Sequence, residues 1–328
     1  MTKRLMKHIA RRGAALLLAC LLLTSMTACG LFAESETEAE TEIPVIEVKE
    51  PPVAGLDTAY AIGSGEISSD YALLCRLDGL EAVAGLRTEE KMYPASLTKL
   101  MTFIVAYERA TDHSALIQIT KELKNQYREG SRIGIDVGDF LTVEQMLYAL
   151  LLESDTDAAL GLAIHVAGSE AAFVELMNEK AEEMGLSHTH FANVTGLHDA
   201  AHYSTAAEMA AILAYAVEIP LGRTIMTTER YVTYLKYYKN DVLTDYRMTF
   251  KNTTLVGRFA DNGVSTSLSD GTKILGGKTG YTDEADYCLA SLAVTADGCE
   301  YILITGHASS SENSARDAVK LYGAYAGE

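Results

Sequence analysis

The sequence predicts a mixed α/β domain of the α+β type, with an antiparallel sheet built from strands at both ends of the chain and an all-helical lobe inserted between them. Three observations support this prediction. Two short apolar runs near the start of the domain are typical of strands, and residues 112–220 are mostly helical in periodicity. Two long apolar runs near the end are followed by one closing helix. The order is therefore strands, helices, strands, helix.

The first part of the domain is a predicted hairpin that leads into a helix. The runs DYALLCRLD (70–78) and EAVAGLRTEE (81–90) are two strands joined around DGLE. In SLTKLMTFIVAYERA (96–110), apolar residues recur at helical spacing. This places Ser96 at the N-terminus of a helix and Lys99 one turn along, on the same face.

Helix start signals divide the middle of the chain. Thr142 and Gln145 have the spacing of a capping box before an apolar run, and Thr205 and Glu208 repeat that spacing. Ser169 is expected to cap a third helix. These signals and the apolar periodicity predict helices within residues 141–155, 156–168, 170–185 and 204–217.

The chain then becomes rich in strand-forming residues. Residues 230–250 (RYVTYLKYYKNDVLTDYRMTF) contain many Tyr, Val and Thr residues. They predict a strand pair with one solvated face, and the alternative is that the tyrosines form a carbohydrate-stacking surface. Residues 287–308 predict two long strands joined by the turn ADG, and residues 311–327 predict the closing helix.

The N-terminus is predicted to be an export signal rather than part of the fold. Residues 1–28 contain five basic side chains followed by AALLLACLLLTSM, an apolar run too short for a good membrane span. Cys29 follows small residues in MTAC, which resembles the lipobox of bacterial lipoproteins, although Met26 is less usual there than leucine. The resemblance implies a lipid on Cys29 and attachment to the outer face of the bacterial cytoplasmic membrane. Ordinary cleavage nearby would instead give a secreted protein.

Residues 29–55 are expected to be a flexible acidic linker, because glutamates alternate with small residues and few large apolar groups are present. Residues 56–328 follow the linker and are long enough for one large domain, which we predict to be the catalytic domain. The net charge is −18, and removal of residues 1–28 takes away five basic and no acidic side chains, which gives −23. Such a charge argues against nucleic acid as a partner.

Cysteine and histidine spacing indicates neither a disulfide framework nor a metal site. Cys75, Cys288 and Cys299 are an odd set, and Cys288 could pair with Cys299 across the last hairpin, although single buried thiols are favoured. We assign no metal and no cofactor. The domain histidines that lack metal-type spacing are His165, His188, His190, His198 and His202.

Lys99 has two interpretations, because a lysine among apolar residues either extends its ammonium to solvent or serves as a base held against a nucleophile. Two further stretches favour the base. LLESDTDAA places Ser154 between two apolar helices. GGKTGYTDEADYC places Lys278, Thr279 and Gly280 before a strand, with glycines that allow close backbone approach. Each motif is common alone, but the ordered combination is specific.

A serine with a lysine three residues later, a serine between two helices and a KTG on a strand form the element set of penicillin-recognising serine enzymes. YPASLTKLMT, NEKAEEMGLSHTHFANVTGLHDAAHYSTAAEMA and GGKTGYTDEADYCLA resemble the serine D-alanyl-D-alanine carboxypeptidases, the low-molecular-mass penicillin-binding proteins. The resemblance covers about residues 55–325 and implies the β-lactamase/DD-peptidase-like fold. It also implies cleavage of the terminal D-alanine from peptidoglycan stem peptides ending in D-Ala-D-Ala, with β-lactam antibiotics as covalent inhibitors.

The resemblance assigns expected roles to the motif residues. Ser96 is the nucleophile, Lys99 is its base if burial and a second cation, Lys278, keep it neutral, and Ser154 relays the proton to the leaving D-alanine. Lys278 and Thr279 would bind the substrate carboxylate, with Gly280 beside them. The backbone N–H groups of Ser96 and Tyr281 would form an oxyanion hole, in which each donor is worth roughly 3 to 4 kcal/mol of barrier.

Two departures from the family pattern are apparent. The middle motif is usually serine–any–asparagine, but here Thr156 stands in place of the asparagine. One hydroxyl lacks the paired donor and acceptor of an amide, so we expect weaker or altered substrate binding. Many relatives also carry a C-terminal β-rich domain and an anchor helix. We expect no such β-domain here, since the chain stops at Glu328, and a lipid on Cys29 would replace the anchor.

Two other functions remain as alternatives. A class A β-lactamase shares the serine–lysine pair and the KTG, and SDT is close to its SDN, but residues 157–220 contain no ExxLN-like stretch to supply a deacylating glutamate. A catalytically idle wall-binding protein is allowed by the altered middle motif. Retention of Ser96, Lys99, Ser154, Lys278 and Thr279 together argues against the idle protein.

Overall fold

The computed structural model describes residues 53–327. The predicted export signal, Cys29 and nearly all of the predicted linker lie outside the described residues. The few linker residues that are described belong to the domain, because Val53 is buried and Ala54 forms a parallel bridge with Glu81. The ordered domain therefore begins before residue 56.

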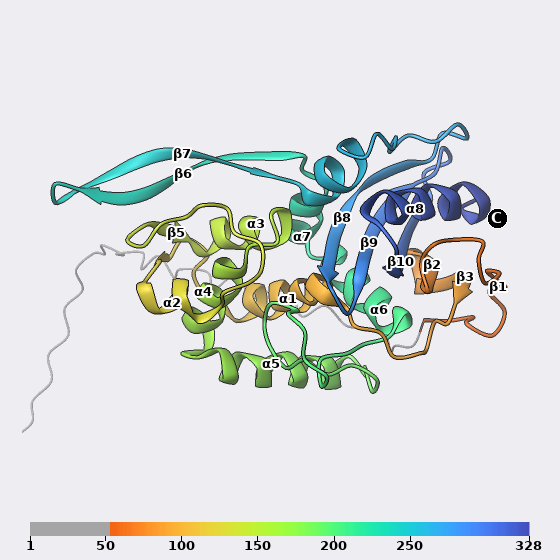
Figure 1. The fold of residues 1–328 in the computed structure, drawn as a ribbon, viewed down its shortest axis with the longest axis horizontal. Coiled ribbons are helices and arrows are strands. Elements are labelled where there is room, and N and C mark those ends of the chain that lie inside the picture. Colours follow the sequence, from red (N-terminus) through yellow and green to blue (C-terminus); the bar gives the residue numbers. More distant parts are fainter. Residues whose placement is uncertain (1–52, 328) are drawn as a thin grey trace, which may run out of the picture. The chain divides into compact units, whose positions relative to one another are not determined.

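One sheet joins the two ends of the chain, as the sequence predicts. Its strand order is β1-β3-β2-β10-β9-β8, and all its pairs are antiparallel except β1 with β3. Helix α8 packs on one face of the sheet, and α6 (Ala206–Glu218) packs on the other (Figure 1). The strands are β1 (Tyr60–Ala61), β2 (Tyr71–Arg76), β3 (Glu81–Leu86), β8 (Lys273–Thr282), β9 (Asp286–Val294) and β10 (Glu300–Ala308); the helix is α8 (Ser311–Tyr325).

The helical lobe lies between these strands in the sequence. The capping box of Thr142 and Gln145 is confirmed, and Ser169 caps its helix. Thr205 also caps, but the Glu208 carboxylate accepts from the backbone of His188 instead of closing a box. The helices are α1 (Lys99–Arg109), α2 (Lys121–Gln126), α3 (Val143–Leu152), α4 (Thr156–Ala167), α5 (Glu170–Glu183), α6 (Ala206–Glu218) and α7 (Pro220–Thr227).

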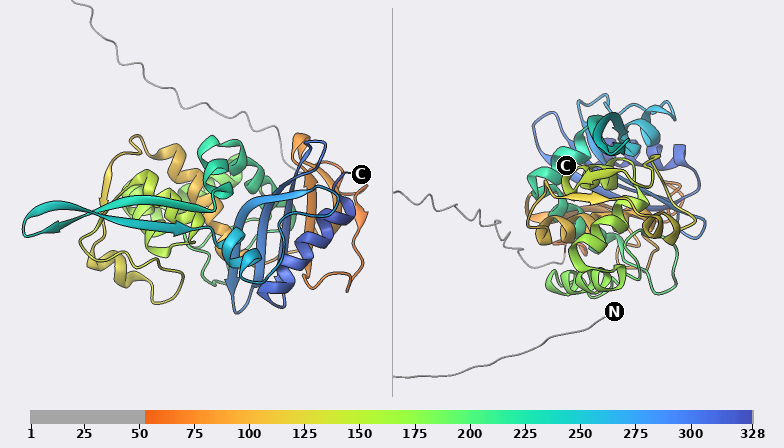
Figure 2. Two further views of the ribbon diagram at one scale, coloured as in Figure 1. Left: turned by 90° about the horizontal axis from the view of Figure 1, so that it is seen from above. Right: turned by 90° about the vertical axis from the view of Figure 1, so that its left-hand side faces the viewer.

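The prediction of an all-helical lobe is wrong, because the lobe carries a second, four-stranded sheet of order β4-β5-β6-β7. Its short strands β4 (Leu116–Gln118), at one edge, and β5 (Phe140–Thr142) have three residues each, too few to show a period in sequence. The long strands β6 (Arg230–Lys239) and β7 (Val242–Lys251) confirm the predicted strand pair. In Figures 1 and 2 this hairpin extends past the helices of the lobe.

Three short helical segments complete the fold, namely η1 (Asp78–Leu80), the 3-10 turn η2 (Ala95–Thr98) and the π-helix η3 (Thr253–Ala260). All three described cysteines are free thiols, and Cys288 and Cys299 lie at opposite ends of the β9–β10 hairpin. Cys75 and Cys288 are buried, whereas Cys299 is exposed.

Within residues 53–327, no single helix has the length and apolar character needed to cross a membrane. Two strongly bent helix pairs, α4 with α5 and α6 with α7, satisfy those criteria only when each pair is taken together.

Candidate active site

The predicted nucleophile and base lie at the junction of η2 and α1. Ser96 sits within the 3-10 turn, and Lys99 is the first residue of α1. The Lys99 Nζ donates to Ser96 Oγ over 3.2 Å and to the carbonyl oxygen of Thr195 over 2.6 Å. The lysine side chain is therefore held against the serine by a fixed backbone acceptor on its other side.

Lys99 is only 2 % exposed, and its ammonium is not extended to solvent. Burial lowers the pKa of Lys99 to about 7, while the negative charge of Asp155 acts in the opposite direction. The expected second cation is not among the causes of this shift. The repulsion between the two lysines lowers the pKa of Lys278 instead. That pKa lies well below the usual value because of burial and then because of the charges of Lys99 and Arg258.

The KTG segment lies on β8, the edge strand of the large sheet, which runs beside η2. A Cβ on Gly280 would lie 3.2 Å from the backbone nitrogen of Ser96 and 3.1 Å from the carbonyl oxygen of Pro94. Glycine at this position thus lets the β8 backbone approach the backbone of the nucleophile. The Tyr281 side chain is half exposed, and its hydroxyl donates to Asp283.

The two polar side chains of the KTG segment differ in position. Thr279 faces the cleft, and its hydroxyl bonds to that of Thr253 at the start of η3. Lys278 is fully buried and its Nζ donates to the Thr279 carbonyl oxygen over 2.7 Å. Lys278 does not line the cleft, so it lies behind the residues that do.

Ser154 and Thr156 of the middle motif form the wall of the cleft that faces the KTG segment. Ser154 has a positive φ of 58°, a conformation that costs a non-glycine residue free energy and is concentrated at functional sites. The hydroxyls of Ser154 and Thr156 are buried and have no hydrogen-bond partner among the described residues. Asp155 instead fixes the backbone between α3 and α4. Its carboxylate accepts from the N–H of Ala158, which caps α4, and from the backbone N–H of Ile133.

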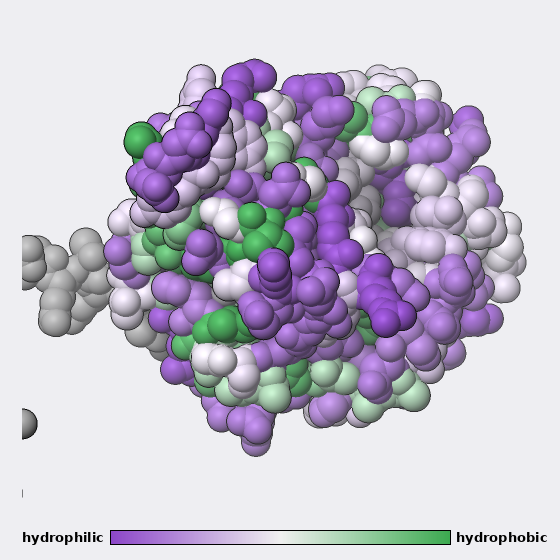
Figure 3. All heavy atoms as spheres, turned by 60° about the vertical axis from the view of Figure 1, so that its left-hand side comes forward, coloured by the Kyte–Doolittle hydropathy of each residue, from purple (hydrophilic) through white to green (hydrophobic). Residues whose placement is uncertain are grey.

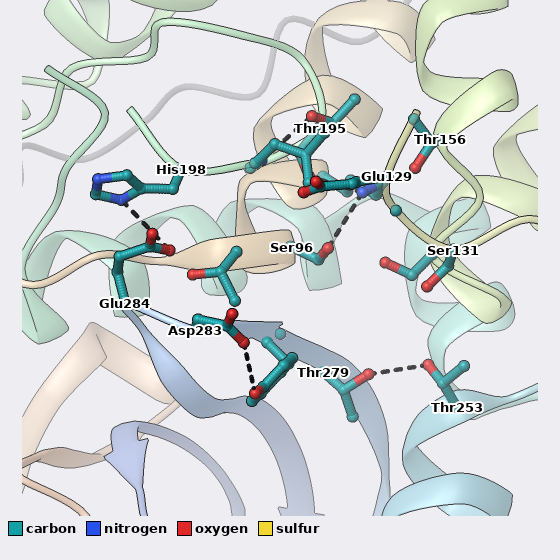
Figure 4. Close-up of a pocket in the computed structure, with 18 of the residues that line it drawn as sticks. Ser96, Glu129, Ser131, Thr156, Thr195, His198, Thr253, Thr279, Asp283 and Glu284 are labelled. Carbon is teal, nitrogen blue, oxygen red and sulfur yellow. Dashed lines mark hydrogen bonds and ion pairs between the residues drawn. The ribbon is translucent and has the colours of Figure 1, made fainter. Parts of the chain in front are cut away.

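These segments surround one cleft of about 660 Å³. Figure 4 shows Ser96 near its centre, with Thr156 and Ser131 on one side and His198 and Glu284 on the other. The wall beside Thr156 comes from the loop Glu129–Gly130–Ser131. The Thr156 N–H donates to the Ser131 carbonyl oxygen, and a Cβ on Gly130 would lie 2.3 Å from Thr156 Oγ1.

Sequence reasoning missed Arg258, which reaches the cleft from η3. Its guanidinium is nearly buried, donates to Ser314 Oγ over 2.5 Å, and lies 5.3 Å from the centre of the Tyr287 ring. Burial lowers the pKa of Arg258 to about 10, so the group stays cationic at neutral pH. GRFADNG matches no motif, and no sequence signal would have identified this arginine.

A second missed group lies behind the nucleophile. The backbone N–H of Ala192 donates to His202 Nδ1, so His202 carries its proton on Nε2, which lies 2.7 Å from Thr98 Oγ1. Thr98 in turn donates to the carbonyl oxygen of Ala95 over 2.7 Å. Ala95 has a positive φ of 47° and directly precedes Ser96. Burial lowers the pKa of His202 to about 4, so this chain of bonds contains a neutral imidazole at neutral pH.

Comparison with known proteins agrees with this geometry. The family model described as D-alanyl-D-alanine carboxypeptidase, Peptidase_S11, matches residues 58–309. The chain therefore belongs to the D-alanyl-D-alanine carboxypeptidase family of serine peptidases, and its fold is that of the DD-peptidases and β-lactamases.

The relatives include the D-alanyl-D-alanine carboxypeptidase DacF of Bacillus subtilis, 31 % identical over 79 % of this chain and 64 % of DacF. The D-alanyl-D-alanine carboxypeptidase of a Streptomyces strain, K15, is 30 % identical over 76 % of this chain and 80 % of its own length. The solved Streptomyces K15 DD-transpeptidase superposes with a TM-score of 0.70 at 26 % identity, covering 80 % of this chain and 98 % of that one. The chain spans about 64 % and 60 % of the first two curated relatives it matches.

Proposed function

We propose that the chain is a serine D-alanyl-D-alanine carboxypeptidase that trims the terminal D-alanine from peptidoglycan pentapeptides through an acyl-enzyme on Ser96. The observation that carries this proposal is the buried Lys99 Nζ at 3.2 Å from Ser96 Oγ. A lysine whose pKa is about 7 is neutral in about half of the molecules at neutral pH and can accept a proton.

In the acylation step, Ser96 Oγ attacks the carbonyl carbon of the penultimate D-alanine, and the serine proton passes to Lys99. The carbonyl oxygen becomes an oxyanion beside the backbone N–H groups of Ser96 and Tyr281. The peptide C–N bond then breaks, and Ser154 relays the proton to the amine of the departing D-alanine. The products of this step are free D-alanine and an ester of the shortened peptide on Ser96.

The carboxylate of the terminal D-alanine is held at the wall formed by β8 and η3, across the cleft from Ser154 and Thr156. Thr279 and Arg258 line this part of the cleft, and we assign them the direct contacts, with the Lys278 side chain behind them. Thr156 contacts the substrate backbone in place of the family asparagine. A cationic wall of this kind favours a substrate that ends in a free carboxylate.

Deacylation returns the enzyme to its starting state. Water attacks the ester carbonyl, the C–O bond to Ser96 breaks, and the serine regains a proton while the shortened peptide leaves with a free carboxylate. A β-lactam acylates the same oxygen by opening its ring. Its amine stays tethered to the acyl group, so no leaving group departs.

The direct test is incubation with a diacetyl-lysyl-D-alanyl-D-alanine peptide and, separately, with a fluorescent penicillin. Wild type should release D-alanine and acquire a covalent label, and Ser96→Ala should do neither. Equal labelling of Ser96→Ala would refute the mechanism. Rapid turnover of a chromogenic cephalosporin would favour the β-lactamase alternative, and absence of D-alanine release with retained wall binding would favour the idle wall-binding protein.

We extend the proposal to the N-terminus, where the basic residues, apolar run and Cys29 support export and lipid attachment at the outer face of the cytoplasmic membrane. The acidic residues 30–52 would then act as a tether for the domain. Metabolic labelling with an alkyne fatty acid should mark the wild-type chain and not Cys29→Ala. Labelling of both chains would place the lipid elsewhere, and labelling of neither would indicate a secreted form.

A further inference from the structure

The most exposed aromatic surface of the domain belongs to the β6–β7 hairpin, outside the cleft. Residues opposite each other in this antiparallel pair project to the same side. Val232, Tyr234 and Tyr238 of β6 are 47 %, 58 % and 60 % exposed. The members of this surface, which we call the hairpin face, are Arg230, Val232, Tyr234, Lys236 and Tyr238 of β6 and their partners Lys251, Thr249, Arg247, Asp245 and Leu243 of β7.

The hairpin differs from the rest of the chain in charge. Residues 230–251 contain five basic side chains and two acidic ones, within a chain of net charge −18. Four of the five basic side chains lie on the hairpin face. Cations that gather on one face of an acidic protein, between exposed aromatic rings, favour an anionic ligand with flat apolar surfaces.

The hairpin face begins at the wall of the cleft. The backbone N–H of Lys251 donates to the carboxylate of Glu153, which directly precedes Ser154. Two residues after Lys251, Thr253 lines the cleft and bonds to Thr279. From this root, strands of ten residues extend roughly 33 Å. Figures 1 and 2 show the hairpin running from η3 along and beyond the helical lobe.

We propose that the hairpin face binds the polymer to which the substrate peptide is attached, a strand of peptidoglycan, while one peptide branch enters the cleft. Sugar rings stack on Tyr234 and Tyr238, which lie four residues apart on the same strand face, and carboxylates of neighbouring branches pair with Lys236 and Arg247. The inference rests on the proposed function, since it names the form in which the substrate is bound.

The arrangement of side chains favours such a polymer over a bilayer or a second copy of the chain. Lys236 forms an ion pair with Asp245 at 3.0 Å, so charges lie on the face between the two tyrosines and interrupt the apolar surface. The tip of the hairpin is Asn240–Asp241, which is polar and carries a negative charge. Figure 3, which brings this end of the molecule forward, shows hydrophobic and hydrophilic side chains interspersed. Two copies meeting at this face would bring like charges together.

The test compares the polymer with a small substrate in the double variant Tyr234→Ala/Tyr238→Ala. Sedimentation with insoluble peptidoglycan should show binding weakened roughly tenfold, given the usual worth of two aromatic contacts. Release of D-alanine from the diacetyl tripeptide should stay within about twofold of wild type, since neither tyrosine lines the cleft. Labelling by fluorescent penicillin reports that the variant is folded.

Two further variants sharpen the result. Val242→Ala is the matched control, because Val242 is 63 % exposed on the same hairpin but pairs with Lys239 on the other face. It should bind peptidoglycan like wild type. Lys236→Gln/Arg247→Gln should reduce both the binding and its dependence on salt.

Three outcomes would overturn the proposal. The tyrosine double variant could sediment with peptidoglycan like wild type, or Val242→Ala could lose peptidoglycan binding to the same extent as the double variant. In the third outcome, the double variant loses binding to phosphatidylglycerol vesicles but keeps its binding to peptidoglycan. The last outcome would assign the face to the membrane. Failure of the proposed function is distinguishable, since wild type would then release no D-alanine while its sedimentation and the effect of the variants would still be measured.

Discussion

The two walls of the cleft are held in different ways. On the nucleophile side, the polar groups already have partners, since Lys99 bonds to Ser96 and Thr195, and Thr98 bonds to His202 and Ala95. On the middle-motif side, the hydroxyls of Ser154 and Thr156 are buried without partners among residues 53–327. An unpaired buried hydroxyl costs free energy that a substrate hydrogen bond would recover. The difference suggests that the first wall fixes the chemistry and the second is completed by substrate.

The largest effect is expected at the base. Lys99→Met should slow acylation by fluorescent penicillin by about 10²–10⁴-fold, because no other described group lies against Ser96 Oγ as a proton acceptor. The matched control is Lys180→Met, which removes a mostly buried lysine paired with Glu108 outside the cleft. Its acylation rate should be that of wild type. A Lys99 variant within tenfold of wild type would show that the two walls do not divide these roles.

The backbone behind Ser96 gives the next largest effect. Gly196 has a φ of 80°, and a Cβ there would lie 1.9 Å from the carbonyl oxygen of Ala95. Gly196→Ala should lower the free energy of unfolding by about 2 kcal/mol or more and slow acylation at least tenfold. Urea unfolding and penicillin labelling measure the two effects.

Gly168→Ala separates strain from contact. Gly168 has a similar φ of 78° but nothing within 4 Å of its Cβ position. This control should lose about 1 kcal/mol of stability and acylate at the wild-type rate. Equal rates in the two variants would mean that the Ala95 contact does not position the nucleophile.

The hydrogen bonds from His202 through Thr98 to Ala95 predict a smaller effect on the acylation rate. They also predict that substitutions of His202 and Thr98 are not additive. His202→Ala and Thr98→Val should each slow acylation roughly tenfold, and the double variant should be little worse than either, because both act through the Ala95 carbonyl. His202→Gln, which keeps a donor, should restore part of the rate. Since the pKa of His202 is lowered to about 4, the pH profile between 5 and 9 should not change in shape. Additive losses would contradict a shared path.

The smallest effect on activity is expected from Thr156, on the wall of the middle motif. Thr156→Asn should lower KM for the diacetyl tripeptide severalfold, the worth of about one hydrogen bond, with little change in kcat. Gly130 packs directly on Thr156, so the loop must move slightly to accept the larger amide. Thr156→Ser keeps the hydroxyl and should resemble wild type. A large loss of kcat in either variant would place Thr156 in the chemistry.

Residues that act through their side chains in contiguous motifs were the ones that the sequence could predict. Ser96, Lys99, Ser154 and Thr279 come together in the structure as the motif spacing implied. Arg258 comes from a segment without a motif, and Thr195 contributes only a carbonyl oxygen, which any residue would provide. Such contributions leave no signature in one sequence.

The same contrast holds for the fold. The strands at 71–86 and 286–308 have clear apolar runs with turn residues between them, and they are placed as predicted. The second sheet was not predicted because β4 and β5 are three residues long, and because β5 joins the hairpin only through the pairing of Phe140 with Lys236, far along the chain. The loop that packs on Thr156 was missed for a related reason, since its role depends on backbone contacts.

The most direct test of the central claim, a neutral Lys99 acting as base for Ser96, is the pH dependence of acylation by fluorescent penicillin. Burial that lowers the pKa of Lys99 to about 7 makes the protonated form predominate below that pH and the neutral form above it. The second-order rate should therefore rise about tenfold per pH unit up to about 7 and then level off. A rate that is flat from pH 5 to 9, or that falls as pH rises through 7, would contradict the account.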